Sequence, residues 1–219
     1  MLRTAVQDYI KVIYELEVAQ GQPTTKAVAE VLGVQMASVT GMVKHLAGEG
    51  VLKHQPYRGF KLTRKGREEA LRMVRRHRLL ELFLVRTLGL RWDEVHADAE
   101  QMEHAVSDAL VERIYEYLGH PQFDPHGAPI PNLDGTVLAR RSVSIAQLKA
   151  GDDGTVTEVE DKDPAFLRFV SSLGIEIGST LQVIGKEPYG GPMRLRLGTR
   201  NIVMGTEAAA RVRVARTES

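Results

Sequence analysis

Apolar side chains recur every three or four positions through the first fifty residues and then alternate in two short runs. This pattern predicts three helices and then two strands, over residues 4–19, 25–33, 36–48, 51–54 and 59–63. Thr24 or Thr25 can cap the second helix, and Gly33 ends it. Three helices followed by a hairpin are the outline of a winged helix.

The remainder of the chain divides into a helical part and a part with a strand period. Residues 64–88 read as one long helix, residues 93–118 contain at least one more, and residues 120–131 form a proline-rich connector. Short alternating runs then predict a small β-barrel interrupted by one helix, with strands at 155–159, 181–184, 193–197 and 211–214 and the helix at 164–173. We therefore expect a mainly α protein with a small β domain, divided at 1–64, 65–135 and 136–219.

Composition excludes several classes of protein. The 219 residues are 43% hydrophobic and 26% charged, which is typical of a soluble globular chain. No stretch approaches about 18 uninterrupted apolar residues, and the first residues lack the apolar core of a signal peptide, so we expect a cytoplasmic protein. With no cysteine, the chain has no disulfide, thiolate zinc site or cysteine nucleophile, and oxygen and imidazole must hold any metal.

Charge is unevenly distributed along the chain. Residues 1–65 carry nine Lys/Arg against five Asp/Glu, whereas residues 66–135 carry eight against thirteen. A basic first third suggests a polyanionic partner, and an acidic, histidine-bearing middle suggests cation binding. The alternative is chance variation among solvated faces.

The second and third helices have the packing signature of a helix-turn-helix. Ala29 is small where two helices cross, Gly33 allows the turn, and Val39 anchors the second helix. The candidates for DNA contact are Gln35, Met36, Ala37, Ser38, Thr40, Lys44 and the wing residue Arg58. Gln35 and Ser38 suit base edges, and Thr40, Lys44 and Arg58 suit phosphates. An ordinary three-helix unit and a protein-binding winged helix are the alternatives.

Histidines and carboxylates recur at helical spacing in the middle third. His77 and Glu81 are four residues apart, and His96, Glu100 and His104 follow at further steps of four, with Glu103 beside them. Imidazole and carboxylate without thiolate suit Mn²⁺, Fe²⁺, Co²⁺ or Zn²⁺. Each histidine alone is more often a surface or core residue. Asp8 reads as the residue that opens the first helix.

These segments together resemble the diphtheria toxin repressor family of metal-dependent transcriptional regulators, including its manganese-transport-regulator branch. The matching segments cover nearly the whole chain, at residues 8–16, 38–43, 57–66, 76–81, 95–108 and 129–131 and in the β-rich tail. The resemblance implies a winged helix-turn-helix, a helical metal-binding and dimerisation domain, and a C-terminal SH3-like (FeoA-like) barrel.

The resemblance also implies two metal sites in each subunit. One would use His77, Glu81 and His96, completed by a carboxylate from the C-terminal domain. Asp163 aligns with that carboxylate, and the next ligand position falls on Phe166, which has no donor atom.

The other implied site would use Asp8, Glu100, Glu103 and His104. Iron-responsive members carry Met at the position of Asp8 and Cys at that of Glu100, so two oxygen ligands resemble the manganese branch. Lys11 stands where shorter members of that branch carry Glu. The resemblance therefore favours two separate sites over a closely bridged pair of ions.

We therefore expect a homodimeric Mn²⁺-dependent repressor of metal-uptake genes that binds palindromic double-stranded operator DNA. Fe²⁺ is the alternative cofactor, and Co²⁺, Cd²⁺ or Zn²⁺ would substitute in vitro. A metal-independent winged-helix regulator is a second alternative. A metallohydrolase is a third, but the sequence offers no general base or nucleophile motif for it. No membrane and no small-molecule substrate are expected as partners.

Overall fold

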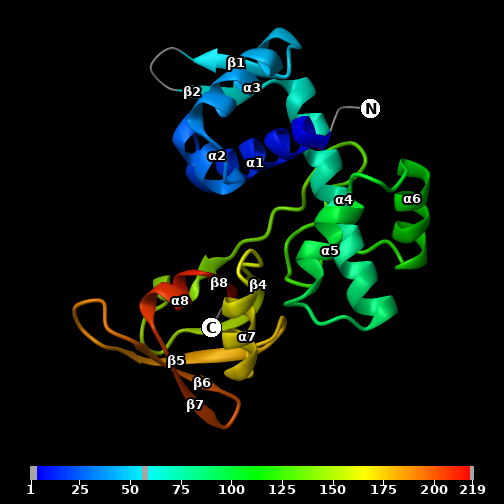
Figure 1. Cartoon of the computed structure of the whole chain (residues 1–219). Coiled ribbons are helices and arrows are strands. Elements are labelled where there is room, and N and C mark those ends of the chain that lie inside the picture. The colour runs from blue at the N-terminus through cyan, green and yellow to red at the C-terminus, as the bar shows by residue number, and fades with distance from the viewer. Residues whose placement is uncertain (1–3, 56–58, 218–219) are drawn as a thin grey trace. The chain divides into compact units, whose positions relative to one another are not determined.

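A computed structural model describes residues 4–55 and 59–217 of the chain. The chain forms two compact units. The N-terminal unit runs to Arg76 and includes residues 131–136, and the C-terminal unit consists of residues 77–130 and the chain from 137 onward (Figure 1). Helix α4, Arg64–Leu88, contributes its first half to one unit and its second half to the other.

The N-terminal unit is a winged helix, as the periodicity predicts. Its helices and strands are α1 (Thr4–Gln20), α2 (Thr25–Leu32), α3 (Met36–Gly48), β1 (Leu52–Gln55) and β2 (Gly59–Leu62). The two strands pair antiparallel. Ile13, Val28 and Val39 are fully buried in the shared core, and α1, α2 and α3 enclose it (Figure 1). Val39 thus anchors α3 at the position that the helix-turn-helix spacing predicts.

The turn between α2 and α3 is defined by residues at both ends of α2. The Thr24 side chain accepts a hydrogen bond from the backbone N–H of Ala27 at 3.1 Å. Gly33 follows the helix with φ 64°, a left-handed conformation that glycine adopts without steric cost. The two residues fix where α2 starts and stops, and hence where α3 can begin.

Replacing Thr24 with alanine is expected to destabilise the N-terminal unit by about 1 kcal/mol, because one N–H at the start of α2 loses its acceptor. Urea denaturation of the purified chain measures the difference. Thr25→Ala is the matched control, since Thr25 is the first helical residue rather than the cap. Equal stability of Thr24→Ala and Thr25→Ala would show that the cap does not stabilise this helix.

A buried carboxylate joins three elements of the N-terminal unit. Glu17 of α1 accepts a hydrogen bond from the backbone N–H of Leu62 at 2.6 Å and another from the Arg67 guanidinium at 2.9 Å. Glu17 is buried, so both bonds form away from water and are charge-assisted. The carboxylate thereby fixes strand β2 and the start of α4 to the first helix.

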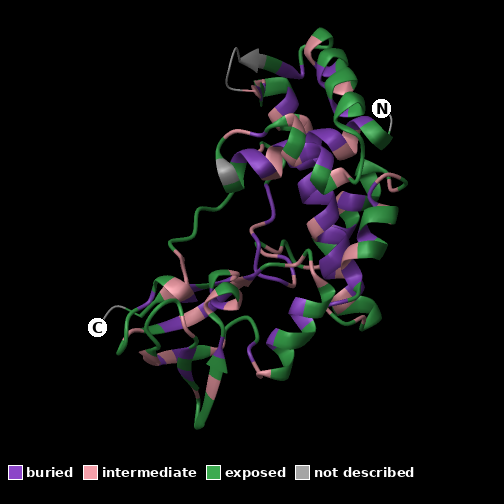
Figure 2. Ribbon diagram, turned by 60° about the vertical axis from the view of Figure 1, so that its left-hand side comes forward, coloured by how far each residue is buried: buried purple, intermediate pink, exposed green. Residues whose placement is uncertain are grey.

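The helical part of the C-terminal unit comprises the second half of α4 with α5 (Val95–Met102) and α6 (Asp108–Tyr117). The middle of α4 is buried almost throughout, polar residues included (Figure 2). The sequence predicts at least one helix in 93–118, and the structure has two. Ser107 caps α6 by accepting from the N–H of Leu110, so α5 ends before it, and Glu103 and His104 lie in the intervening turn.

The C-terminal β domain is built on a six-stranded antiparallel sheet of order β3-β8-β4-β5-β6-β7. The strands are β3 (Val143–Ser144), β4 (Asp153–Val159), β5 (Thr180–Lys186), β6 (Met193–Leu197), β7 (Arg200–Met204) and β8 (Val212–Arg216). Helices α7 (Pro164–Ser172) and α8 (Thr206–Ala210) and the short turn Ile145–Gln147 complete it. The predicted β domain and its helix are confirmed, whereas β7 and α8 were not predicted.

None of the helices in the described part of the chain combines the length and apolarity that crossing a membrane requires.

Candidate metal centre

Three side chains in the C-terminal unit converge on one point. His77 and Glu81 lie one turn apart on α4, and His96 lies in the first turn of α5. His77 Nε2 lies 3.0 Å from Glu81 Oε1 and 3.1 Å from His96 Nδ1, and His96 Nδ1 lies 3.0 Å from Glu81 Oε1. Donors on one ion with bonds of about 2.1 Å at right angles lie about 3.0 Å apart, so the triangle has the spacing of a metal site.

A carboxylate orients His77 from its other side. His77 Nδ1 lies 2.6 Å from Glu103 Oε2, and Glu103 is buried. When Nε2 faces a cation, Nδ1 carries the proton and donates it to Glu103, which is the usual arrangement behind a metal-bound histidine. Glu103 is itself grouped with exposed Glu100 around His77. His104 Nε2 lies 3.7 Å from the second oxygen of Glu103, so that oxygen faces a further candidate ligand.

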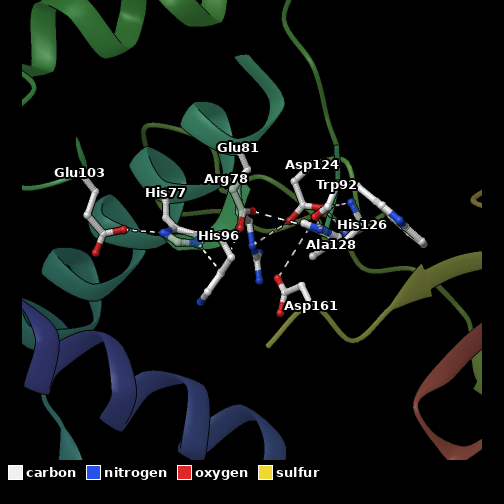
Figure 3. Close-up of polar contacts among 10 residues, drawn as sticks. All are labelled: His77, Arg78, Glu81, Trp92, His96, Glu103, Asp124, His126, Ala128 and Asp161. Atoms are coloured by element: carbon white, nitrogen blue, oxygen red, sulfur yellow. Dashed lines mark hydrogen bonds and ion pairs between the residues drawn. The ribbon is translucent and has the colours of Figure 1, made fainter. Parts of the chain in front are cut away.

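A second cluster begins at the other oxygen of Glu81. His126 Nδ1 lies 3.8 Å from Glu81 Oε2 and 3.9 Å from Asp161 Oδ2, and Asp124 completes the group. Asp124 and His126 belong to the connector after α6, and Asp161 lies between β4 and α7 of the β domain. Figure 3 shows the side chains in a row from Glu103 to His126, with Asp161 reaching His126 from the β domain. The cluster therefore joins the helical and β parts of the C-terminal unit.

Fixed contacts hold the connector loop in place. Asp124 Oδ1 accepts hydrogen bonds from the backbone N–H groups of His126 and Ala128 at 2.8 and 3.0 Å, and its Oδ2 lies 3.5 Å from Arg78 Nε. His126 Nε2 donates to the carbonyl oxygen of Trp92 at 2.8 Å. A carbonyl can only accept, so Nε2 carries the proton, and in the neutral ring Nδ1 presents a lone pair to the two carboxylates.

Burial and charge oppose each other in these groups. Burial works against ionisation of Glu81, yet the imidazoles of His126, His77 and His96 outweigh it and hold the pKa of Glu81 well below its usual range. Burial alone would lower the pKa of His126, but the Glu81, Asp124 and Asp161 carboxylates outweigh it and raise that pKa to about 9. Without a metal, a proton on His126 thus balances part of the negative charge.

The metal-free protein is expected to lose stability as the pH rises from 6.5 to 9. His126 titrates near 6.5 when unfolded and near 9 when folded, so its contribution is complete below pH 6.5 and is lost as the pH passes 9. We expect a loss on the order of 2 kcal/mol in chelator-treated protein, measured by urea denaturation across this range. His126→Gln should flatten the dependence, and His45→Gln, at an exposed histidine, should not. An unchanged pH profile in His126→Gln would contradict this origin.

The residues of the two clusters fit a divalent cation. Glu81 Oε2, Asp124 Oδ2 and His126 Nδ1 are all buried and have no hydrogen-bond partner among the described residues. A buried polar atom without a partner costs free energy, and a cation is the partner that two carboxylates and a bare imidazole nitrogen share. Oxygen and imidazole donors suit Mn²⁺ and Fe²⁺, with Zn²⁺ and Co²⁺ as competitors.

The structure places the predicted C-terminal ligand differently from the alignment. Asp163 is the N-cap of α7: its carboxylate accepts from the backbone N–H groups of Ala165 and Phe166 and pairs with Arg211. The carboxylate that faces the cluster is that of Asp161, two residues earlier. The sequence carried a signal for this difference, because Asp before Pro164 is typical of an N-cap followed by the first helical residue.

Two other expectations can be placed on the structure. Asp8 does not open α1, which begins at Thr4, and it lies partly buried a full turn inside the helix, in the N-terminal unit. Sequence reasoning missed Asp124 and His126, which stand two residues apart in the proline-rich connector. Their only signal was the pairing of an acid and a histidine in a segment that its prolines make rigid.

Helix α3 presents its polar residues as expected for a recognition helix. Gln35, Met36, Ala37, Ser38, Thr40 and Lys44 are all exposed. The Thr40 hydroxyl donates to the carbonyl of Met36 at 2.9 Å, and its lone pairs remain available to an outside donor. Exposed Gly41 has no neighbour within 4 Å of a β-carbon position, so this face has no bulk that would hold off a groove. Arg58 lies outside the described residues.

Comparison with known protein families gives three matches that follow one another along the chain. Residues 1–60 match the iron dependent repressor N-terminal DNA binding domain, and residues 63–132 match the iron dependent repressor metal binding and dimerisation domain. Residues 143–216 match the FeoA domain.

Individual relatives agree with these matches. The iron-dependent repressor IdeR of Mycobacterium leprae is 29% identical over 218 residues, or 94% of each chain. The HTH-type transcriptional regulator MntR of Oceanobacillus iheyensis is 38% identical over 53% of this chain and 78% of its own length. Among solved structures, a manganese-dependent transcriptional repressor in complex with manganese superposes with a TM-score of 0.91 at 41% identity. That match covers 97% of this chain and all of the other.

Proposed function

Because the chain belongs to the iron-dependent repressor family, the diphtheria toxin repressor family that its motifs resemble, we propose that it is a Mn²⁺-responsive repressor of metal-uptake genes. The family establishes the coarser function: the chain is a metal-dependent, DNA-binding transcriptional repressor with a dimerisation domain, and not an enzyme. The choice of Mn²⁺ and the palindromic operator belong to the proposal.

The observation that supports Mn²⁺ is the donor set of the second cluster. It consists of the carboxylates of Glu81, Asp124 and Asp161 with one imidazole, and the chain has no cysteine to add a softer donor. Hard oxygen donors lose less affinity for Mn²⁺, relative to later transition metals, than thiolate or thioether donors do. Asp8 and Glu100, where iron-responsive members carry Met and Cys, extend the same preference to the other proposed site.

We further propose that metal controls DNA binding through a ligand on the DNA-binding domain. Asp8 of α1 would complete a site with Glu100, Glu103 and His104 of the metal-binding domain. A shared ion would restrict the orientations that the two domains sample. In a homodimer this would fix the spacing of the two α3 helices, so that they enter successive major grooves. The metal-free protein would sample several spacings and bind more weakly.

DNA binding as a function of free metal tests the proposal. Sites selected from a random duplex library in the presence of Mn²⁺ would be titrated with protein, anaerobically, in Mn²⁺, in Fe²⁺ or in chelator. We expect tight binding in Mn²⁺, weaker activation by Fe²⁺ at equal free concentration, and loss of affinity in chelator. Stronger activation by Fe²⁺ would overturn the manganese assignment alone, whereas equal affinity in chelator would overturn metal control.

The proposed contacts of α3 and the wing give a further expected result. Lys44→Ala should weaken binding to all sequences about equally and reduce the salt dependence, because it removes a phosphate contact, and Arg58→Ala should act in the same way. Gln35→Ala should instead relax base preference at one position by about 1–3 kcal/mol. Affinities for every single-base variant of the selected site distinguish these effects. A change of base preference in Lys44→Ala without a general loss of affinity would contradict the assigned roles.

A further inference from the structure

The two clusters of the C-terminal unit share one residue but not one atom. Glu81 Oε1 lies 3.0 Å from both His77 Nε2 and His96 Nδ1. Glu81 Oε2 lies 3.8 Å from His126 Nδ1 and has no hydrogen-bond partner. The side chain is fully buried, so water does not compete for either oxygen. Each oxygen of this carboxylate is therefore available to a different cation.

The first cluster is complete with Oε1 alone. Its three edges of 3.0, 3.1 and 3.0 Å suit neighbouring donors of a single ion, and none of them involves Glu81 Oε2. Glu103 holds the outer nitrogen of His77 at 2.6 Å and so fixes the ring with Nε2 towards Glu81 and His96.

The second cluster needs a positive charge of its own. His126 Nε2 donates to the Trp92 carbonyl, so the neutral ring turns a lone pair towards Glu81 Oε2 and Asp161 Oδ2. These separations of 3.8 and 3.9 Å are too long for hydrogen bonds and match donors spread around one ion at wider angles. A cation held by His77 and His96 leaves this lone pair and its two carboxylates unmatched.

From these observations we propose that Glu81 bridges two divalent cations, one held with His77 and His96 and the other with Asp124, His126 and Asp161. The proposal rests on the function proposed above, since it assumes that the chain binds metal. Carboxylates commonly bridge ion pairs about 3.5–4 Å apart. The repulsion between the ions is offset by the carboxylates of Glu81, Glu103, Asp124 and Asp161, against which the group has one guanidinium, that of Arg78.

This bridge has a structural consequence within the C-terminal unit. The first ion would be held by α4 and α5 only, whereas the second takes Asp161 from the β domain. Filling the second position therefore fastens the β domain to the helical part. Trp92 already lies at this junction: its ring stacks on His126 with centroids 5.7 Å apart, and its indole N–H donates to Ser171 of α7 at 2.9 Å.

Metal stoichiometry of the full-length chain tests the bridge. Bound Mn²⁺ would be counted by equilibrium dialysis for the wild type, His96→Gln, Asp161→Asn and the double variant. Glu160→Gln is the matched control, because it removes the adjacent exposed carboxylate, which pairs with Arg211. Two bridged ions predict that each single variant loses one ion per chain relative to the wild type, that the double variant loses two, and that the control loses none.

Other results would overturn the proposal. If the clusters are alternative positions for one ion, each single variant keeps the wild-type count and only the double variant loses an ion. If only one cluster binds, only one of the single variants loses an ion. Each result leaves the proposed repressor function standing. Equal DNA affinity with and without Mn²⁺ in the wild type would instead remove that function, whatever the ion count.

The single tryptophan gives an independent measurement. Paramagnetic Mn²⁺ beside His126 should quench Trp92 fluorescence. Quenching should therefore persist in His96→Gln and be lost in Asp161→Asn. Persistent quenching in Asp161→Asn would contradict the placement of the second ion.

Discussion

Replacing Asp8 with alanine is expected to lower Mn²⁺-activated affinity for operator DNA by at least about 100-fold, the scale on which loss of a metal ligand or of coupling between sites acts. The substitution removes the one proposed ligand that the DNA-binding domain supplies. Glu100, Glu103 and His104 would then have no ligand from that domain to share an ion with, and metal would no longer restrict the position of α3.

Metal binding separates this mechanism from a loss of fold. His77, Glu81 and His96 lie outside the N-terminal unit, so calorimetric titration of Asp8→Ala should still show ions bound there. A capping role for Asp8 would give a different result, namely lower stability with normal activation. The structure already disfavours that role, because α1 begins at Thr4 and Asp8 lies beyond its first turn.

The control for Asp8→Ala is an acidic residue of the same unit without a proposed ligand role. Glu68 is exposed and pairs with Arg64 on the first turns of α4. Glu68→Ala should leave metal-activated binding within about two-fold, because a surface pair contributes at most about 1 kcal/mol. Full metal activation in Asp8→Ala would show that metal reaches the DNA-binding domain by another route.

Local pattern predicts the elements of this chain well where one face is clearly buried. Val28 and Val39 repeat at helical spacing and lie in the core as expected. Strand β7 escaped prediction because it is the edge strand of the sheet, where Arg200, Asn201 and Val203 are all exposed and alternation is weak. Helix α8 is a single short turn and has no period to detect.

The candidate site divides along the same line. His77 and Glu81 are found from spacing because one helix holds both, and α5 places His96 beside them. Asp124, His126 and Asp161 come from a connector and a loop, where spacing along the chain carries no information about distance. Only folding of the connector against β4 brings them to Glu81, and no local rule anticipates that contact.

The contact that brings them together depends on Gly127. Strand β4 has an irregular register against β8 between Val156 and Glu158, so Thr157 stands out of the regular ladder. Its carbonyl oxygen accepts from Arg140 at 3.0 Å and lies where a β-carbon on Gly127 would be, 1.9 Å away. The next contact, from Val159 N–H to the His126 carbonyl at 2.9 Å, fixes the loop to the strand. Only glycine permits this approach.

Gly127→Ala is therefore expected to destabilise the protein by at least about 4 kcal/mol, a value reached only when backbone or core must move. The methyl group would push the loop off β4, carry His126 away from Glu81 and Asp161, and remove the ion held by them. Gly119→Ala is the matched control, because Gly119 has a similar φ of 77° but no atom within 4 Å of its β-carbon position.

The comparison of the two alanine variants separates strain from collision. Gly119→Ala should cost only about 1 kcal/mol, the penalty for a left-handed side chain, and should keep the wild-type number of bound Mn²⁺ ions. Denaturation and dialysis of both variants measure stability and ion count together. If Gly127→Ala is no less stable than Gly119→Ala and binds as many ions, the loop is not held against β4 as described. Its closeness to Thr157 would then not be what positions His126.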